Sequence, residues 1–263
     1  MKGRKKRKHL IDAREKIKEK IKNKHVYLFL DFDGTLSAIR RNPSEVKLSR
    51  AKFKILKKIS EKKDITTAII SGRALKEIKN LVGIKNLIYA GNHGMEMGRS
   101  RGKGNKKTKV IGKILQKKLE KIKGVLVEDK GATLSAHFRM AARGKEKEVI
   151  RIIKEITLPY EKAGDIRVTQ GKKVFEIRPP FAWDKGRCVE HLLREKRKTL
   201  KRRVSAFYLG DDETDEDVFK RLKKRIFCVK VGKPEGKGTS ANYYLNGVQE
   251  VGRFLKKLCE LLV

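Results

Sequence analysis

Short apolar runs alternate with amphipathic stretches along most of the chain. Apolar runs occur at residues 26–30, 65–70 and 87–90, and helical spacing of apolar residues separates them at 51–60 and 74–81. Apolar runs of this length are typical of strands that a sheet buries on both faces. The succession therefore predicts a βαβαβ unit, in which a parallel sheet is covered by helices.

The rhythm changes after Gly91. A Gly- and Lys-rich stretch comes first, and then an α+β pattern: helix 110–121, strands 125–128 and 133–138, helix 146–156, and strands 166–169 and 174–177. The first rhythm then returns as helix 185–196, strand 205–209, helix 214–222, strand 226–229 and helix 248–261. Pro179 and Pro180 mark the point of return. We expect a discontinuous α/β core at 26–100 and 180–263, with an α+β domain inserted at 101–179.

The first 25 residues predict a basic helix or arm. Leu10, Ile17 and Ile21 fall on one helical face, which would allow the arm to dock on the core. A highly charged terminus can equally remain in solvent, and we expect solvation here.

The chain carries a formal charge of +38 and has a pI of about 10.2. Such charge suggests nucleic acid or an anionic membrane as a partner. The basic residues are spread along nearly the whole chain, however, and aromatic residues make up only 6% of it, so no platform for stacking bases is visible. We expect most lysines to be solvated, nucleic acid to bind only non-specifically through charge, and an anionic small substrate to be attracted by the field.

No stretch approaches 18 consecutive apolar residues, and the basic N-terminus lacks the apolar segment of a secretory signal. We therefore expect no membrane span. Cys188, Cys228 and Cys259 follow no metal-binding or redox spacing. They indicate free thiols in a reducing compartment, and we expect a cytoplasmic protein.

Carboxylates gather where predicted strands end. Asp31 and Asp33 follow the first apolar run, and the segment GDDETDED at 210–217 follows the strand at 205–209. Clustered carboxylates repel one another and need a cation to hold them. Because ligands of open α/β sheets bind at the carboxyl ends of the strands, these segments are expected to converge on one crevice.

The convergence predicts a magnesium and phosphate site. Asp31, Asp33 and Asp211 would hold Mg²⁺ through oxygen atoms, which argue against zinc. Ser71, with the backbone N–H groups of the turn it begins, would cradle a phosphate oxygen, and Lys185 would place an ammonium beside the same phosphate. Each of these features alone has an ordinary explanation, such as an N-cap or a solvated lysine, but their coincidence at successive strand ends does not.

At these residues the chain resembles the haloacid dehalogenase-like phosphatases. DFDGT at 31–35, the strand-end serine, the lysine and the GDD segment occur in that family's order. A finer resemblance is to the trehalose-6-phosphate phosphatase branch, and it is carried by these segments: LFLDFDGTLSAI (28–39), ISGR (70–73), AGNHGME (90–96), VEDK (127–130), SAHFR (135–139), FEIRP (175–179), WDKG (183–186) and GDDETDEDVF (210–219). The fold implied is a Rossmann-like parallel-sheet core of the haloacid dehalogenase type with an inserted α+β cap.

The resemblance implies roles for individual residues. Asp31 would attack phosphorus and form an aspartyl-phosphate, and Asp33 would protonate the leaving sugar oxygen and then activate water. Mg²⁺ would be held by the Asp31 and Asp211 carboxylates and the Asp33 carbonyl. The remaining core residues implied are the phosphate-binding Ser71, Gly72 and Arg73, the catalytic Lys185, and the supporting acids Asp212 and Asp215.

The resemblance also implies substrate residues. Glu128, Lys130, Arg139 and Glu176 of the cap would hydrogen-bond the glucose hydroxyls, and Asn92 would lie at the rim of the site. Without it, Glu128 and Lys130 would be interpreted as a surface ion pair. The implied activity is Mg²⁺-dependent hydrolysis of trehalose 6-phosphate by a monomer, with a separate trehalose-phosphate synthase supplying the substrate. Alternatives are phosphates of sucrose, mannosylglycerate or glucosylglycerol as substrates, and a basic nucleic-acid-binding pseudoenzyme.

Overall fold

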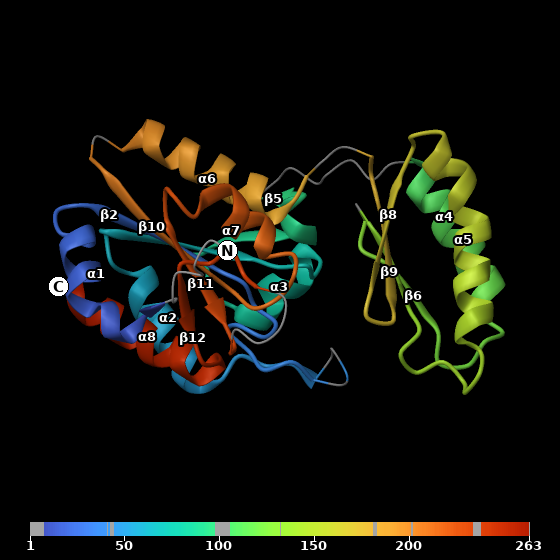
Figure 1. Ribbon diagram of the computed structural model, residues 1–263, viewed down its shortest axis with the longest axis horizontal. Coiled ribbons are helices and arrows are strands. Elements are labelled where there is room, and N and C mark those ends of the chain that lie inside the picture. The colour runs from blue at the N-terminus through green and yellow to red at the C-terminus, as the bar shows by residue number, and fades with distance from the viewer. Residues whose placement is uncertain are drawn as a thin grey trace, which may run out of the picture. The chain divides into compact units, whose positions relative to one another are not determined.

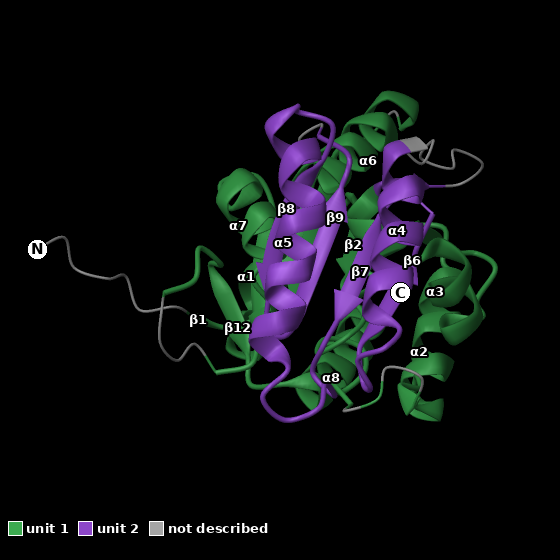
Figure 2. Ribbon diagram, turned by 90° about the vertical axis from the view of Figure 1, so that its right-hand side faces the viewer, with its two compact units in different colours: residues 1–94, 183–263 green, residues 95–182 purple. Residues whose placement is uncertain are grey.

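A computed structural model describes residues 8–40, 42, 45–97, 106–131, 133–180, 183–200, 202–233 and 238–262. The chain forms two compact units, residues 1–94 with 183–263 and residues 95–182 (Figure 2). The boundary predicted between 100 and 101 lies outside the described residues. At the other junction the boundary between the two units falls between residues 182 and 183, whereas the sequence predicts it between residues 179 and 180.

A parallel sheet is the centre of the first unit. Its order is β1-β12-β11-β10-β2-β3-β4-β5, and neighbouring strands run parallel from β1 to β4. The strands are β1 (Lys8–His9), β2 (His25–Leu30), β3 (Ile65–Ile70), β4 (Ile88–Gly91), β10 (Val204–Gly210), β11 (Phe227–Val231) and β12 (Tyr243–Leu245), with β5 (Glu96–Met97) where the chain leaves the unit. Every residue of β2 is buried, as its unbroken apolar run predicts.

Helices cover both faces of this sheet. Helices α6 and α7 lie on one face, and α1, α2 and α8 lie on the other (Figure 1). The helices of the first unit are α1 (Arg14–Ile21), α2 (Arg50–Ser60), α3 (Leu75–Val82), α6 (Lys185–Thr199), α7 (Glu216–Leu222) and α8 (Val248–Leu261), with short 3₁₀ turns at Ile11–Ala13 and Asn92–Gly94. Mostly leucine, isoleucine, valine and phenylalanine side chains of the sheet and of helices α1, α2, α3 and α8 form one buried core. Among the described residues, no helix combines the length and apolarity needed to cross a bilayer.

The second unit is an antiparallel sheet with two helices. Its strand order is β6-β7-β9-β8, and α4 and α5 cover one face of it (Figure 1). The elements are α4 (Lys106–Leu119), β6 (Leu126–Asp129), β7 (Leu134–His137), α5 (Glu146–Lys162), β8 (Arg167–Gly171) and β9 (Val174–Arg178). A separate apolar core lies between the sheet and the helices. Helix α5 continues through Pro159 to Lys162, beyond its predicted end at 156.

The N-terminal arm docks on the core, so its predicted solvation is wrong for the residues that the structure describes. Strand β1 pairs with β12, and Leu10, Ile17 and Ile21 are at most 5% exposed. His9 Nε2 also lies 2.8 Å from a carboxylate oxygen of Glu250 on α8. Burial of three large apolar side chains outweighs the solvation of their charged neighbours, because the lysines between them keep their ammonium groups in water. Residues 1–7 lie outside the described residues.

The chain leaves and re-enters the first unit at one place. Gly94 has φ +95°, and a Cβ there would lie 2.4 Å from the Cys188 Cβ and 3.2 Å from Trp183 Nε1. Trp183 is the first residue of the returning segment. The two junctions are therefore adjacent, and glycine is required where they meet.

His25, the first residue of β2, is a buried neutral group in a positive environment. It is 2% exposed, and its Nε2 lies 2.8 Å from the hydroxyl of Thr66. Burial, reinforced by the charges of Lys196 and Arg202, lowers the pKa of His25 to about 4. Between this value and the ordinary value near 6.5, the unfolded chain binds a proton that the folded chain does not bind.

We therefore expect the stability linked to His25 to be complete above about pH 6.5 and to be lost as the pH falls toward 4. The loss should be about 1–3 kcal/mol. Urea unfolding at several pH values, compared between the native protein and His25→Gln, measures it: the variant should show a flatter dependence in this window. Parallel curves would contradict the assignment.

Candidate active site

The ends of three adjacent parallel strands bring the predicted core residues together. The backbone N–H of Asp31, after β2, donates to the carbonyl of Leu209 on β10 at 3.0 Å. Ser71 follows β3, the neighbour of β2 on its other side. The acidic segment beginning at Asp211 follows β10, so three segments distant in sequence meet at one edge of the sheet.

Lys185 is the electrostatic centre of this edge. Its side chain is 3% exposed, and its ammonium donates to Asp31 Oδ1 and to Asp215 Oδ1, both at 2.8 Å. Burial alone lowers the pKa of Lys185, but the attraction of Asp215, Asp31 and Asp212 outweighs it and raises the pKa well above the ordinary value. Lys185 is therefore a permanent buried cation.

Asp31 is a buried carboxyl in contact with that cation. Burial raises its pKa well above the ordinary value, the Lys185 charge opposes the rise, and the nearby acids Asp215, Asp211 and Asp212 add to it. The charge on Asp31 thus depends on the positive charge placed beside it. A carboxylate held in this way, with little water around it, is suited to act as a nucleophile.

Asp215 holds the lysine in place and is fully buried. Its Oδ1 accepts from Lys185 and from the Tyr208 hydroxyl, the latter at 2.5 Å, and its Oδ2 accepts from the backbone N–H of Asp212 at 3.0 Å. Both oxygens are thus engaged by protein donors. This arrangement suits the supporting role that the resemblance implies for Asp215.

Asp211 lies beside the DFDGT turn. Its Oδ1 accepts from the Thr35 hydroxyl at 3.3 Å, and its backbone carbonyl accepts from the Lys230 ammonium. Burial, with repulsion from Asp215 and Asp212, raises the pKa of Asp211 to about 7. Gly34 has φ +81°, and a Cβ there would lie 2.0 Å from Asp211 Oδ2. The glycine is therefore needed for both its conformation and the close approach of Asp211.

Asp212 organises the turn that leads into α7. Its Oδ1 accepts from the backbone N–H and the hydroxyl of Thr214, at 2.9 and 2.7 Å, and from the backbone N–H of Asp215. Burial opposes its ionisation, but the Lys185 charge and these hydrogen bonds prevail and hold its pKa below the ordinary range. Asp212 thus shapes the acidic turn as a stable anion.

Asp33 is clamped by an arginine. Arg73 Nε and Nη2 donate to the two oxygens of Asp33 at 2.7 and 2.8 Å, and its Nη1 donates to Glu77. The sequence predicts phosphate binding for Arg73, whereas in the structure its guanidinium engages two carboxylates. A bidentate pair of this kind fixes the orientation of the Asp33 carboxylate.

The turn after β3 holds the other predicted phosphate residues. Ser71 is 1% exposed, and its hydroxyl accepts from the backbone N–H of Arg73 at 3.1 Å. A Cβ on Gly72 would lie 2.9 Å from the imidazole of His93, so a larger residue there would displace that ring. Asn92 is buried with φ +49°, and its backbone N–H donates to the Arg73 carbonyl at 2.8 Å. The phosphate-binding role of this turn stays a prediction.

The donor set at this edge fits magnesium. Carboxylate oxygens of Asp31, Asp211 and Asp215 lie within 4.8 Å of one another. Hard oxygen donors in a small cluster are the ligands that Mg²⁺ prefers, and Mg²⁺ sites commonly use one or two carboxylates. Repulsion from Asp215 and Asp212 adds to the rise in the pKa of Asp211, and a bound cation would relieve that repulsion. Of the three, Asp31 and Asp211 have fewer protein donors than Asp215 and are better suited as ligands.

The predicted cap residues lie in the second unit. Lys130 Nζ lies 3.7 Å from Glu128 Oε2 and 3.5 Å from Glu176 Oε1, so β6, β9 and the loop after β6 contribute to one charged cluster. The Ser135 hydroxyl donates to Glu176 Oε1 at 2.6 Å. The other oxygen of Glu176 is buried, and no described residue donates a hydrogen bond to it. Arg139, in the turn after β7, is exposed.

The sequence did not predict Tyr208 as part of the core site, and it did not predict the pairing of Arg73 with Asp33. Tyr208 supports Asp215, and Arg73 holds Asp33. The signal for Tyr208 was a hydroxyl within an otherwise apolar strand, because a buried tyrosine hydroxyl needs a partner. No sequence signal gives the geometry of the Arg73 pair.

A buried acid, a second acid two residues later, a buried lysine and an acidic turn, gathered where parallel strands end, are the features of a haloacid dehalogenase-type phosphatase. The fold agrees: a haloacid dehalogenase-like hydrolase from Bacteroides thetaiotaomicron superposes with a TM-score of 0.62 at 16% identity, over 89% of this chain and 100% of that chain.

More similar proteins define the family. The trehalose-phosphatase family model matches residues 29–249. Trehalose-phosphate phosphatase B of Arabidopsis thaliana is 33% identical over 91% of this chain and 67% of that protein. The C-terminal domain of Candida albicans trehalose-6-phosphate phosphatase superposes with a TM-score of 0.79 at 27% identity, over 97% of this chain and 99% of that chain. The chain belongs to the trehalose-phosphatase family.

Gly34→Ala should displace Asp211 and cut phosphatase activity by at least about 100-fold, since it misplaces a predicted metal ligand. Gly83→Ala is the matched control, because Gly83 also has positive φ, at 65°, but nothing lies within 4 Å of its added Cβ. The control should lose only about 1–2 kcal/mol of stability and keep its activity. Hydrolysis of p-nitrophenyl phosphate and thermal unfolding measure both effects. Equal activity in the two variants would contradict the close approach described above.

Proposed function

We propose that this protein hydrolyses trehalose 6-phosphate to trehalose and phosphate, with Mg²⁺ and through an aspartyl-phosphate. The observation that carries the chemistry is the buried Asp31 carboxyl, which contacts Lys185 at 2.8 Å and shares its strand edge with Asp211. The assignment of trehalose 6-phosphate as the substrate rests on the similarity of the chain to trehalose-phosphate phosphatases.

The reaction has two steps on the same carboxyl. An oxygen of Asp31 forms a bond to phosphorus while the bond from phosphorus to the sugar oxygen breaks, and Asp33 gives a proton to that leaving oxygen. Water then attacks phosphorus, Asp33 takes its proton, and the bond to Asp31 breaks to release phosphate. Before the first step, Lys185 keeps the Asp31 carboxylate ionised and oriented for attack.

Asp33 must carry a proton for the first step. In the structure Arg73 pairs with both oxygens of Asp33. We propose that this pair orients the Asp33 carboxyl toward the leaving oxygen and the attacking water. Asp31 and Asp211 with the Asp33 carbonyl would hold Mg²⁺, which when bound neutralises charge on the phosphoryl oxygens.

The charged cluster of the second unit would recognise the sugar. A disaccharide offers many hydroxyl groups, and charged side chains are strong hydrogen-bond partners for them. The buried Glu176 oxygen without a described donor supports this role, because such an oxygen needs a hydroxyl or water to satisfy it. We propose the same role for Glu128, Lys130 and Arg139, and a place near the substrate for Asn92.

A separate trehalose-phosphate synthase would supply the substrate, and the enzyme would act as a monomer in the cytoplasm. Cys188, Cys228 and Cys259 are buried and free, which supports a reducing compartment. The alternative of a nucleic-acid-binding pseudoenzyme has less support, because the lysine and acids needed for hydrolysis are present and in contact.

A panel of sugar phosphates tests the activity. With Mg²⁺, phosphate release should be fastest from trehalose 6-phosphate, it should stop with a chelator, and it should return when Mg²⁺ is restored. Asp31→Asn should lower turnover by at least about a thousandfold, because it removes the nucleophile. Asp12→Asn is the matched control, because the Asp12 side chain is exposed on the N-terminal segment. This variant should retain turnover. Faster release from sucrose 6-phosphate or another member of the panel would remove the substrate assignment, and activity in chelator would remove the metal.

Glu176→Gln separates sugar recognition from chemistry. We expect a KM for trehalose 6-phosphate that rises about tenfold and an unchanged kcat/KM for p-nitrophenyl phosphate, which lacks the sugar. Glu155→Gln, an exposed glutamate on α5, should change neither value. An equal loss on both substrates would contradict a sugar-binding role for Glu176.

A further inference from the structure

A strongly basic pocket opens where the parallel strands of the first unit begin. The acids and Lys185 lie at the opposite ends of these strands, which we call the catalytic edge. The pocket has a volume of about 610 Å³ and is lined by residues at the starts of β10 and β11, by α1, and by the ends of α6 and α7. Strand β10 enters it at Val204 and reaches the catalytic edge at Gly210. At about 3.3 Å per residue, the pocket lies about 20 Å from the acids. We call it the basic pocket.

Its composition exceeds the basic background of the chain. Nine of its sixteen lining residues are Lys or Arg and none is Asp or Glu, whereas Lys and Arg make up 69 of the 263 residues overall. An even scatter of charge would place about half as many cations there and would include an acid or two. The basic pocket is therefore a local concentration of positive charge.

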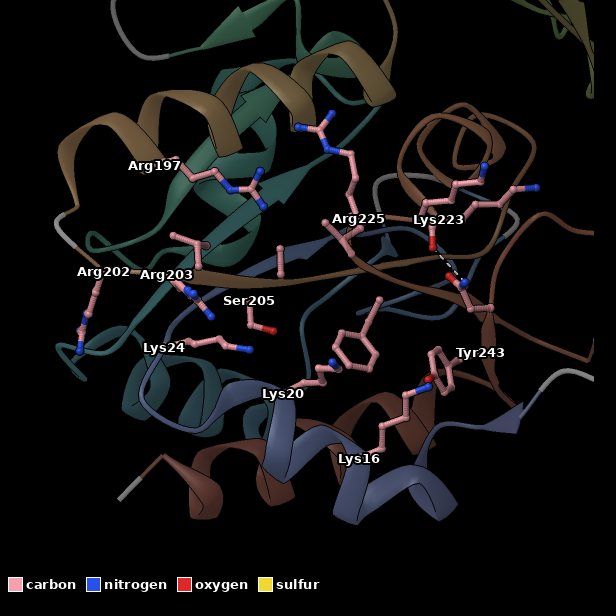
Figure 3. A pocket seen from close by; sticks show the side chains of 16 residues that line it. Lys16, Lys20, Lys24, Arg197, Arg202, Arg203, Ser205, Lys223, Arg225 and Tyr243 are labelled. Atoms are coloured by element: carbon pink, nitrogen blue, oxygen red, sulfur yellow. Dashed lines mark hydrogen bonds between the residues drawn. The ribbon is translucent and has the colours of Figure 1, made fainter.

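The N-terminal arm forms one wall of the basic pocket. Lys16, Lys20 and Lys24 recur every four residues, so the first two share one face of α1 and the third follows the helix, while Ile17 and Ile21 dock a neighbouring face on the core. Figure 3 shows Lys16 and Lys20 rising from α1 at the bottom of the view. The spacing of lysines and isoleucines in the arm thus places its cations in the pocket and its apolar side chains in the core.

The opposite walls bring further cations toward the same space. Arg197 points down from α6 at the top of Figure 3, and Arg203 and Lys24 lie near Ser205 in its centre. Lys223 lines the pocket from the turn after α7. These groups come from segments far apart in the chain, so no single sequence run produces their concentration.

Most of these cations have no acidic counterpart. Arg202 pairs with Asp64, and Arg225 pairs with Glu190 at 2.5 Å. Across the part of the chain that the structure describes, no ion pair engages Lys20, Lys24, Arg197, Arg203, Lys223 or Lys224. Burial and the charge of Arg225 lower the pKa of Arg197, and the pKa of His25 is lowered in the same positive environment. An anion bound here would relieve this repulsion.

The form of the pocket favours a compact ligand. A concavity of this volume is within the range of small-molecule sites, whereas a nucleic-acid surface follows a long groove with exposed aromatic rings. Tyr243 lines the pocket, but it is only 6% exposed and packs on Phe227, so it offers no open face for a base. The recognition available is by charge and by the N–H groups of lysine and arginine.

We propose that the basic pocket binds a compact polyphosphate anion, of the class that includes inorganic triphosphate and the triphosphate tail of a nucleotide. The anion bridges cations of α1 to those of the turns before β10 and β11 and of the end of α6. Because these residues take no part in the catalytic edge, binding here is separate from the proposed hydrolysis.

Calorimetric titration of the full chain with inorganic triphosphate tests this proposal. The titration uses a chelator, so that the catalytic edge carries no metal, and ~150 mM salt, which screens diffuse surface charge. The test variant is Lys20→Gln/Lys223→Gln. The control is Lys147→Gln/Lys154→Gln, which removes the same charge from two exposed lysines of α5.

We expect one triphosphate per chain, a Kd at least about tenfold weaker in the pocket variant, and an unchanged Kd in the control. Both variants should hydrolyse p-nitrophenyl phosphate with Mg²⁺ like the native protein, which shows that they fold and keeps this test independent of the proposed function. ATP with the same Kd as triphosphate would mean that the phosphate tail alone is recognised, and tighter ATP binding would identify a nucleotide as the source. Absent binding, equal weakening in both variants, an unaffected pocket variant, or a pocket preference for duplex DNA over triphosphate would each overturn the proposal.

Discussion

One buried ammonium sets the arrangement of the catalytic edge. Lys185 lies between Asp31 and Asp215, at 2.8 Å from each, where almost no water reaches it. A buried charge without a partner costs several kcal/mol, so each of the three groups requires the other two. The same contact joins strand β2, helix α6 and the acidic turn after β10. Packing of the core and placement of the Asp31 carboxyl thus depend on the same contact.

The entry into α6 shows how closely this contact is built. The Asp184 carboxylate caps the helix by accepting from the backbone N–H of Arg187 at 2.7 Å, which places Lys185 at the first helical position. A Cβ on Gly186 would lie 2.6 Å from the carbonyl of Asp217, so the helix approaches the acidic turn at backbone distance. The WDKG segment therefore combines a cap, the cation and a close approach in four residues.

The sequence predicted those parts of the fold and site that depend on local pattern. Strand β2 and the acidic turn after β10 were predicted because a buried run followed by polar residues is a local feature, and their meeting follows from the geometry of parallel sheets. Strands β1 and β12 were missed because two or three residues are too few to show a period. The docking of the arm was missed because three apolar residues among many lysines do not reveal what they contact. The Arg73 clamp on Asp33 depends on side-chain geometry across forty residues, which no spacing rule encodes.

The adjacency of Gly94 and Trp183 has a consequence for how such proteins diversify. A segment that departs and returns through one narrow neck can be shortened, enlarged or exchanged for an unrelated module without rethreading the sheet. Natural recombination at this neck would replace the second unit while leaving the segments that carry Asp31, Lys185 and Asp211 intact. The same neck is a natural joint for grafting a foreign recognition module in the laboratory.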